Sequence, residues 1–245
     1  MSWNDKKIEQ HCRAAKLLDE VKESTFKFVR NNHQISEYEV QAHIKDEFDK
    51  KGLVTDRDNA IVAFRENTGF VHYYPTADCK KLSPDTLIMI DLWARVDEDD
   101  APFADITWMA YSGKEIDPLV QNTFVLVIKS RDAALKFIRK NLKKGKIPTG
   151  KEIDDVTRKV IATAGLADKF VHTTGHSLGF ESPHGKEFGL NWKNEHPLIK
   201  NLAYTIEPGI YFEDKFGIRS EIDFYINDKL ELIITTKVQK ELIII

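Results

Sequence analysis

Four acidic residues occupy similar places on two predicted β-hairpins, and this pattern constrains the fold more than any other feature of the chain. Asp91 ends one apolar run and Asp105 opens the next, so residues 86–112 are predicted to form a hairpin with a wide loop. Glu207 and Glu221 lie on either side of a short turn-like segment, which again suits a hairpin. A fold that pairs these strands would bring four carboxylates to one place.

Helices are predicted wherever apolar residues recur at helical spacing. They cover residues 4–31, Ser36 to Gly52, Asp117 to Gly145 and Thr149 to Gly165. Further strands are predicted at 61–64, 203–226, 230–235 and 241–245. Helices precede a hairpin twice along the chain, although the residues themselves do not repeat. This order predicts an α+β fold with a pseudo-symmetric duplication of its layout.

The composition excludes several classes of protein. With 245 residues, of which 42% are hydrophobic and 31% charged, the chain is predicted to be a single globular domain spanning 1–245. Its net charge of −3 gives no basic field for nucleic acid. No apolar run approaches the ~18–20 residues of a membrane span, and no secretory signal is visible. Two isolated cysteines are predicted to be reduced thiols of a cytoplasmic protein.

The four acids indicate a metal site only when they are considered together. Each aspartate taken alone is more often an ordinary acid at the water boundary. Four clustered carboxylates, however, cannot all stay ionised without strong compensation by cations. His176, in a segment flanked by glycines, adds a nitrogen ligand that manganese, cobalt, zinc or iron accepts and magnesium seldom uses. The pattern predicts a hydrolase site with two divalent metal ions.

The sequence resembles the pita-bread metallopeptidases, which include methionine aminopeptidase, aminopeptidase P, prolidase and the related creatinase. The resemblance covers nearly the whole chain. It rests on Ile-Asp91, Ala-Asp105-Ile-Thr, Thr-Gly-His176-Ser-Leu-Gly, Thr-Ile-Glu207-Pro-Gly-Ile-Tyr and Gly-Ile-Arg-Ser-Glu221. It implies a pseudo-twofold arrangement of helices around a curved antiparallel sheet, and it is closest to a stand-alone catalytic domain of the Xaa-Pro branch.

The resemblance also implies the roles of the metal ligands. Asp91 would bind one metal ion through both oxygens, and Asp105 and Glu221 would bridge the two ions. His176 and Glu207 would complete the shell of the second ion. Glu207 would also act as the general base that takes a proton from the attacking water.

Three further histidines match positions of the family that contact substrate. His72 would contact the substrate, His184 would polarise the peptide or steady the oxyanion, and His172 matches the first residue of the His-x-x-Gly-His form of the proline-directed branch. For each of them the alternative is an ordinary hydrogen-bonded imidazole. The remaining candidates, His11, His33, His43 and His196, are interpreted as having no role in the site.

The sequence departs from the family in ways that leave some properties open. Ser177 replaces the usual glycine after the metal-binding histidine, and the Asp91–Asp105 loop is longer than usual. The separate N-terminal domain of prolidase and aminopeptidase P is expected to be absent. Because that domain helps relatives to dimerise, a homodimer is one expectation and the oligomeric state stays open.

The leading functional hypothesis is a metallo-aminopeptidase that acts on peptides, with a preference for Xaa-Pro bonds. The preference rests on His172-x-x-Gly-His176 and on the short separation of Glu207 and Glu221. Methionine aminopeptidase is the runner-up because its chain length fits. A catalytically inactive module that binds a peptide or partner is the alternative outside the enzymes, and a creatinase-like hydrolase is a weaker third possibility.

Overall fold

The computed structural model describes residues 1–56 and 60–245, and its elements confirm the α+β prediction. The helices are α1 (Asp5–Arg30), α2 (Glu37–Lys51), α3 (Pro118–Leu142) and α4 (Gly150–Thr163), with 3₁₀ turns at Arg65–Gly69 and Ala167–Lys169. The strands are β1 (Leu53–Val54), β2 (Ile61–Phe64), β3 (Thr86–Val96), β4 (Ala104–Ser112), β5 (Ala203–Ile206), β6 (Gly209–Phe212), β7 (Phe216–Arg219), β8 (Ile222–Ile226), β9 (Leu232–Ile234) and β10 (Ile243–Ile244). Each of these helices lies within a few residues of its predicted range.

Local sequence signals explain the helix ends. Ser36 and Glu39 form a capping box at the start of α2, in which each side chain bonds the backbone N–H of the other residue. Thr149 and Glu152 do the same for α4. Gly52 ends α2 with a φ of 64°, a left-handed conformation that glycine adopts without a steric cost.

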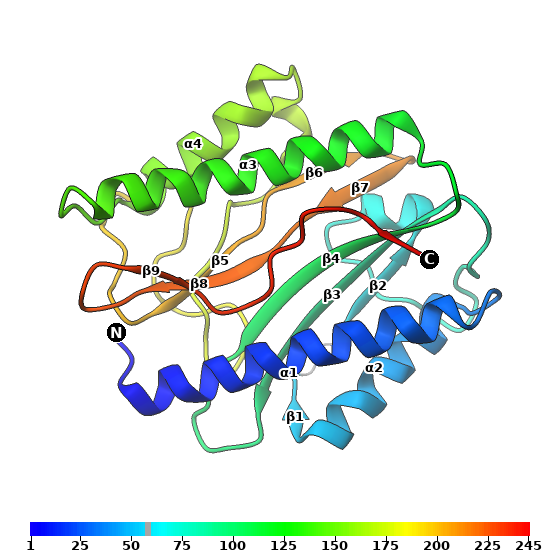
Figure 1. Ribbon diagram of the computed structural model, residues 1–245, viewed down its shortest axis with the longest axis horizontal. Coiled ribbons are helices and arrows are strands. Elements are labelled where there is room, and N and C mark those ends of the chain that lie inside the picture. The colour runs from blue at the N-terminus through cyan, green and yellow to red at the C-terminus, as the bar shows by residue number, and fades with distance from the viewer. Residues whose placement is uncertain (57–59) are drawn as a thin grey trace.

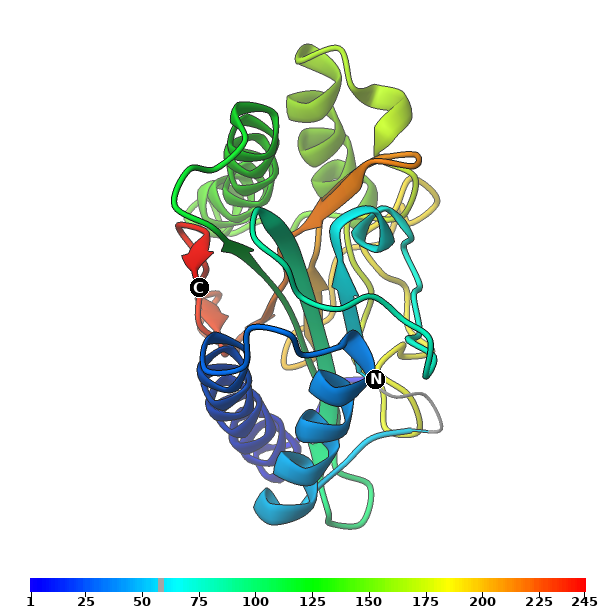
Figure 2. The same ribbon diagram turned by 90° about the vertical axis from the view of Figure 1, so that its right-hand side faces the viewer.

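The long helices α1 and α3 lie on one side of the strands, whereas the irregular segment 170–202 lies on the other side (Figures 1 and 2). The alternation along β3 explains this layering. Ile88 and Ile90 pack with Leu18 of α1 in one apolar cluster. Met89 and Trp93 belong to a second cluster on the opposite face. Asp91, which is in phase with these two, therefore faces away from α1.

The second predicted hairpin forms in part, and the prediction that Glu207 and Glu221 lie within its strands is wrong. β6 and β7 pair antiparallel from Gly209–Arg219 to Phe212–Phe216. Both strands of this hairpin are interrupted at the acids, because β5 pairs with β8 in a different sheet. Pro208 lacks an N–H and cannot continue a ladder. The two glutamates therefore lie where the chain passes from one sheet to the next.

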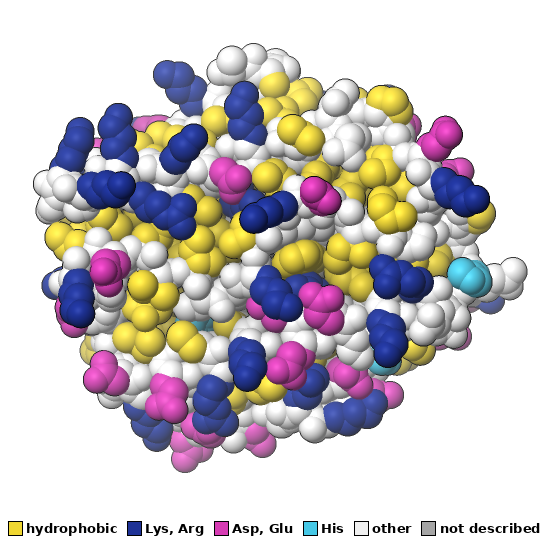
Figure 3. All heavy atoms as spheres, viewed as in Figure 1, with side chains coloured by type: hydrophobic (Ala, Val, Ile, Leu, Met, Phe, Trp, Pro, Cys, Tyr) yellow, Lys and Arg dark blue, Asp and Glu magenta, His cyan; other side chains and the backbone are white. Residues whose placement is uncertain are grey.

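A basic surface follows the end of α3, and Figure 3 shows Lys and Arg side chains gathered there at the upper left. The exposed residues are Lys136, Arg139, Lys140, Lys143, Lys144 and Lys146. Cations near a helix C-terminus are favoured by the helix dipole, and these side chains are exposed to solvent. None of the helices in the described residues is long and apolar enough to cross a membrane.

Candidate active site

The first pair of acids projects from β3 and β4 on the face turned away from α1. Asp91 pairs with Thr107, and Asp105 pairs with Trp93, so the two acids are diagonal neighbours across the strands. Asp91 is 7% exposed and Asp105 is 5% exposed. One oxygen of each carboxylate is buried and accepts no hydrogen bond from the residues that the structure describes. Such oxygens are costly to bury, and a bound cation would offset this cost.

The second pair of acids reaches the same place from the breaks in the strands. The backbone N–H of Glu207 donates to the carbonyl of Thr174 (2.8 Å). The N–H of Glu221 donates to the carbonyl of Thr107 (3.2 Å), and the Thr107 hydroxyl donates to the Glu221 carboxylate (2.8 Å). Glu221 is thus bound twice to β4, beside the first pair of acids.

His176 lies in the irregular segment that packs against β5. Its backbone N–H donates to the hydroxyl of Thr205 (3.0 Å), and Gly175 pairs with Leu190 on its other side. A Cβ atom on Gly175 would overlap the backbone carbonyl of Thr205, so this position requires glycine. The glycine flanking His176 is therefore needed for the close approach that brings the histidine to the acids.

The imidazole of His176 is presented in the form that binds metals. Its Nδ1 lies 2.9 Å from the carbonyl of Ser177, to which it donates, so the lone pair is on Nε2. Nε2 lies 3.7 Å from an oxygen of Asp105 and 3.4 Å from an oxygen of Glu207. Burial lowers the pKa of His176 to about 4. The ring is therefore neutral at pH 7, with its free nitrogen directed at the acids.

The acid cluster is unfavourable without cations. Burial, and then the charge of Glu221, raises the pKa of Asp105 well above its usual value. Burial, and then the charge of Glu207, does the same to the pKa of Glu221. Burial also raises the pKa of Glu207 to about 7. Ligand atoms of Asp105, His176 and Glu221 all lie within 4.8 Å of one another, and this donor set fits a divalent ion such as manganese, zinc, iron or cobalt.

Arg219, which the sequence interpretation did not assign to the site, supports the acids from β7. Its guanidinium forms an ion pair with Asp91 and donates to the hydroxyls of Thr107 (3.0 Å) and Tyr211 (2.9 Å). Thr107 in turn donates to Glu221, so Arg219 links acids from both pairs. In the sequence, Arg219 alternates with the apolar residues of its strand and precedes Glu221 by two residues. This spacing was the signal that could have placed Arg219 on the same face as Glu221.

His172 lies on the cavity wall with both ring nitrogens already hydrogen-bonded. Nδ1 lies 2.9 Å from the carbonyl of Thr173, and Nε2 lies 2.9 Å from the hydroxyl of Tyr211. Burial, and then the charge of Arg219, lowers the pKa of His172 to about 3. A neutral His172 therefore donates from Nδ1 and accepts from Tyr211. This geometry holds the hydroxyl of Tyr211 in place at the cavity wall.

His72 and His184 line the same cavity, which has a volume of about 290 Å³. The ring centroids of His184 and His176 are 4.2 Å apart. Burial, and then the neighbouring His176, lowers the pKa of His184. The structure thus brings all five predicted metal ligands and the three predicted substrate histidines to one cavity.

Glu37, a second residue that the sequence interpretation did not assign to the site, anchors the loop that carries His72. Its buried carboxylate accepts hydrogen bonds from the hydroxyl of Tyr73 (2.7 Å), the amide of Asn67 (2.9 Å) and the N–H of Lys80 (3.2 Å). A carboxylate bound by several donors fixes local geometry tightly. The start of α2 therefore positions the neighbour of His72.

Comparison with known proteins identifies relatives along almost the whole chain. YkvY of Bacillus subtilis, a protein named for an inferred dipeptidase activity, is 32% identical over 243 residues, which cover 99% of this chain and 62% of YkvY. An X-Pro aminopeptidase from Thermotoga maritima has a TM-score of 0.85 and 26% identity, covering 100% of this chain and 64% of that one. A prolidase from Thermococcus sibiricus has a TM-score of 0.85 and 25% identity, covering 99% and 62%.

These relatives confirm the pita-bread fold, and they also show that the chain spans less than two thirds of the length of each of them. The model of metallopeptidase family M24 matches residues 9–228, a range that contains each acid and histidine of the cavity. The chain therefore belongs to metallopeptidase family M24.

Proposed function

We propose that the chain is a dinuclear metal-dependent peptidase that hydrolyses an N-terminal peptide bond, with a preference for Xaa-Pro bonds. The observation that carries this proposal is the convergence of four carboxylates and one neutral imidazole on a single cavity. Asp91, Asp105 and Glu221 are buried there, and Glu207 is partly buried. The names of the X-Pro aminopeptidase and the prolidase among its structural relatives support the preference for proline.

Asp91, Asp105, His176, Glu207 and Glu221 would hold the two ions, which we propose to be manganese, cobalt, zinc or iron. When bound, such ions supply a Lewis acid and lower the pKa of a water molecule toward neutrality. The four carboxylates carry a formal charge that two divalent ions would balance. Arg219 would keep Asp91 oriented through its ion pair.

Glu207 would act as the general base in this cavity. Its pKa of about 7 in the metal-free chain reflects burial, and its carboxylate lies at the cavity wall where it can accept a proton from the attacking water. His184 would steady the oxyanion of the tetrahedral intermediate, since its ring lies beside that of His176. His72 and His172, which also line the cavity, would contact the substrate.

We expect the manganese-loaded chain to hydrolyse Xaa-Pro peptides at least about tenfold faster, in kcat/KM, than Met-Ala peptides, because the difference between related side chains in one pocket is typically ~1–3 kcal/mol. Release of the N-terminal amino acid, followed by mass spectrometry on a matched peptide pair, measures this. A clear preference for Met-Ala would replace the proposal by the methionine aminopeptidase alternative.

A further inference from the structure

A buried ion pair on α4, the helix at the top of Figure 1, has no part in the function proposed above. Asp154, whose side chain is fully buried, lies 2.7 Å from the guanidinium of Arg158 one helical turn later. Neither residue is among the described residues that line the cavity. Packed apolar side chains often stabilise a fold as much as a buried ion pair does, so this pair calls for an explanation besides stability.

Arg158 binds the irregular segment that carries His172. Its guanidinium donates to the backbone carbonyl of Phe170 (3.1 Å) and to that of His172. It also lies over the ring of Phe170, 4.4 Å from the ring centroid. A guanidinium holds several acceptors at once in a fixed planar geometry, which an ammonium group cannot do. Arg158 therefore fixes the backbone at His172, whose ring contacts the hydroxyl of Tyr211.

Asp154 binds the same segment two residues further along the chain. One oxygen of its carboxylate accepts hydrogen bonds from the backbone N–H (3.2 Å) and the hydroxyl (2.7 Å) of Thr174. The other oxygen binds Arg158, so both oxygens are engaged. The carbonyl of Thr174 in turn accepts the backbone N–H of Glu207 (2.8 Å). Asp154 is thus connected to Glu207 through Thr174.

Resting on the proposed peptidase function, we infer that Asp154 and Arg158 are positioning residues for the reaction. Arg158 sets the place of His172, which would contact the substrate. Asp154, through Thr174, sets the place of Glu207, which would be the general base. Because the two residues act on neighbours with different tasks, their loss affects different kinetic constants.

The contacts of Arg158 are tested by Arg158→Lys in the manganese-loaded chain. Lysine keeps a positive charge beside Asp154 but cannot hold both carbonyls. The displacement of His172 is expected to raise KM for an Xaa-Pro peptide about tenfold and to keep kcat within about twofold, because ~1 Å of misplacement can cost roughly 10²-fold. A pair that only stabilised the fold would reduce the amount of active chain, which lowers kcat and leaves KM unchanged.

The contacts of Asp154 are tested at Thr174. Thr174→Val keeps the shape of the side chain but removes the hydroxyl, and it is expected to lower kcat about tenfold because Glu207 loses its fixed place. Thr174→Ser restores the hydroxyl and should return kcat to within about twofold of wild type. As a matched control, Asp155→Asn breaks an exposed ion pair with Lys151 on the same helix and should leave both constants unchanged.

Nuclear magnetic resonance of the chain with isotope-labelled histidine gives a readout that needs no hydrolysis. In the metal-free chain, His172 should carry its proton on Nδ1, as its hydrogen bond to the carbonyl of Thr173 requires. The spectrum of His172→Gln identifies the signal of this ring. Arg158→Lys is expected to shift that signal and to leave the signal of His43, which lies on α2, unchanged.

For a chain that cleaves peptides, the inference is overturned if Arg158→Lys leaves KM within about twofold of wild type, or if Thr174→Val leaves kcat within about twofold. Such a result would leave the proposed function intact. For a chain that cleaves no peptide, the proposed function fails, and the signal of His172 decides the inference separately. An unchanged signal in Arg158→Lys would then overturn it, whereas a shifted signal would support the positioning of His172.

Discussion

Replacing Glu207 by alanine is expected to reduce peptide turnover by roughly 10³-fold, to the limit of detection. General acid–base catalysis typically contributes 10²–10⁴-fold, and Glu207 is also a candidate metal ligand, so its loss removes two contributions. The measurement is kcat on an Xaa-Pro peptide with saturating manganese. A variant as active as wild type would show that the assignment of the proton transfer is wrong.

Two companion variants separate the roles of Glu207. Glu207→Gln keeps the shape of the side chain and one oxygen ligand but cannot accept a proton, so a variant that retains its metal content and loses turnover would isolate the base. Glu213→Ala removes an exposed glutamate from the nearby β6–β7 turn and should behave as wild type. A similar loss in Glu213→Ala would indicate disruption of the hairpin.

The stability of the metal-free chain is expected to fall as the pH rises above about 6.5. Burial raises the pKa of Asp105, Glu221 and Asp223 well above the usual value. Burial raises the pKa of Glu207 to about 7, so Glu207 contributes only up to about pH 7. The folded chain therefore binds more protons than the unfolded chain in this pH window. For each such carboxyl group, the free energy of unfolding falls by up to ~1.4 kcal/mol per pH unit. His172 and His176, whose pKa values are lowered to about 3 and 4, have the opposite effect, but only below pH ~6.5.

Manganese is expected to reverse this dependence, because its ligands must be deprotonated and binding becomes stronger as the pH rises. An ion at 100–1,000 times its dissociation constant stabilises by about 2.7–4.1 kcal/mol, which raises the melting temperature of a chain of this size by roughly 5–16 °C. Melting curves from pH 6.5 to 8.5, recorded with manganese or with chelator, measure how the melting temperature changes with pH in each condition. Identical curves in the two conditions would favour the inactive binding module.

The sequence was most informative where regular alternation fixes the direction of a side chain. The apolar run before Asp91 predicted a buried strand, and the second strand of the hairpin was predicted to carry Asp105 opposite it. The structure confirms both strands, although β3 continues to Val96, so that Asp91 lies in its middle and not at its end. Capping residues located the helix ends to within a few residues. In each case a local rule, either the strand period or a cap, determines the structure.

The sequence was less informative where the chain passes from one sheet to another or has no regular secondary structure. The positions of Glu207 and Glu221 in strand breaks depend on hydrogen bonds to Thr174 and Thr107, which are distant in sequence. His176 lies in an irregular segment with no periodicity, and its approach depends on the absence of a side chain at Gly175. Tertiary contacts of this kind leave no local pattern, so they could be inferred only through the resemblance to a family.

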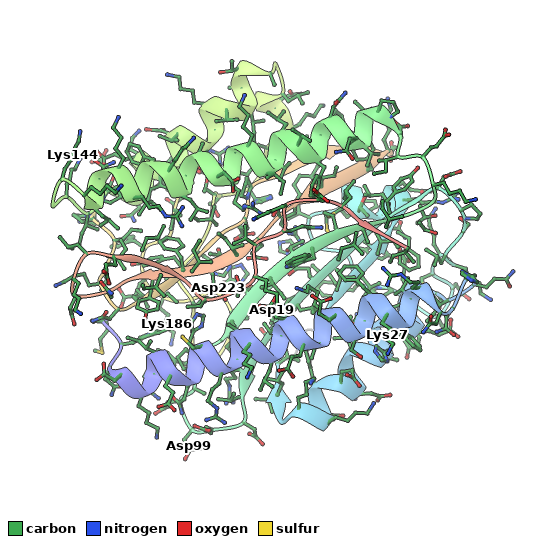
Figure 4. The ribbon with its side chains drawn as sticks, viewed as in Figure 1. Asp19, Lys27, Asp99, Lys144, Lys186 and Asp223 are labelled. Atoms are coloured by element: carbon green, nitrogen blue, oxygen red, sulfur yellow. The ribbon has the colours of Figure 1, made fainter. Side chains whose placement is uncertain are left out.

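The supporting residues were missed for a related reason. Asp223 is an example: its carboxylate accepts a hydrogen bond from the backbone N–H of Asp105 (2.9 Å), and Figure 4 shows it on β8, among the central strands. Glu37 acts through the neighbour of His72, and Arg219 acts through its ion pair with Asp91. An isolated charged residue in a sequence is usually exposed, and only the fold reveals that these three are buried.

The most direct test of a dinuclear peptidase is the rate of Leu-Pro peptide hydrolysis measured as manganese is added stoichiometrically to the metal-free chain. The account predicts negligible hydrolysis without metal and a rate that rises until two equivalents of manganese are bound per chain. Full activity with one equivalent would contradict the dinuclear mechanism, and hydrolysis that is unaffected by chelator would contradict the metal-dependent site altogether.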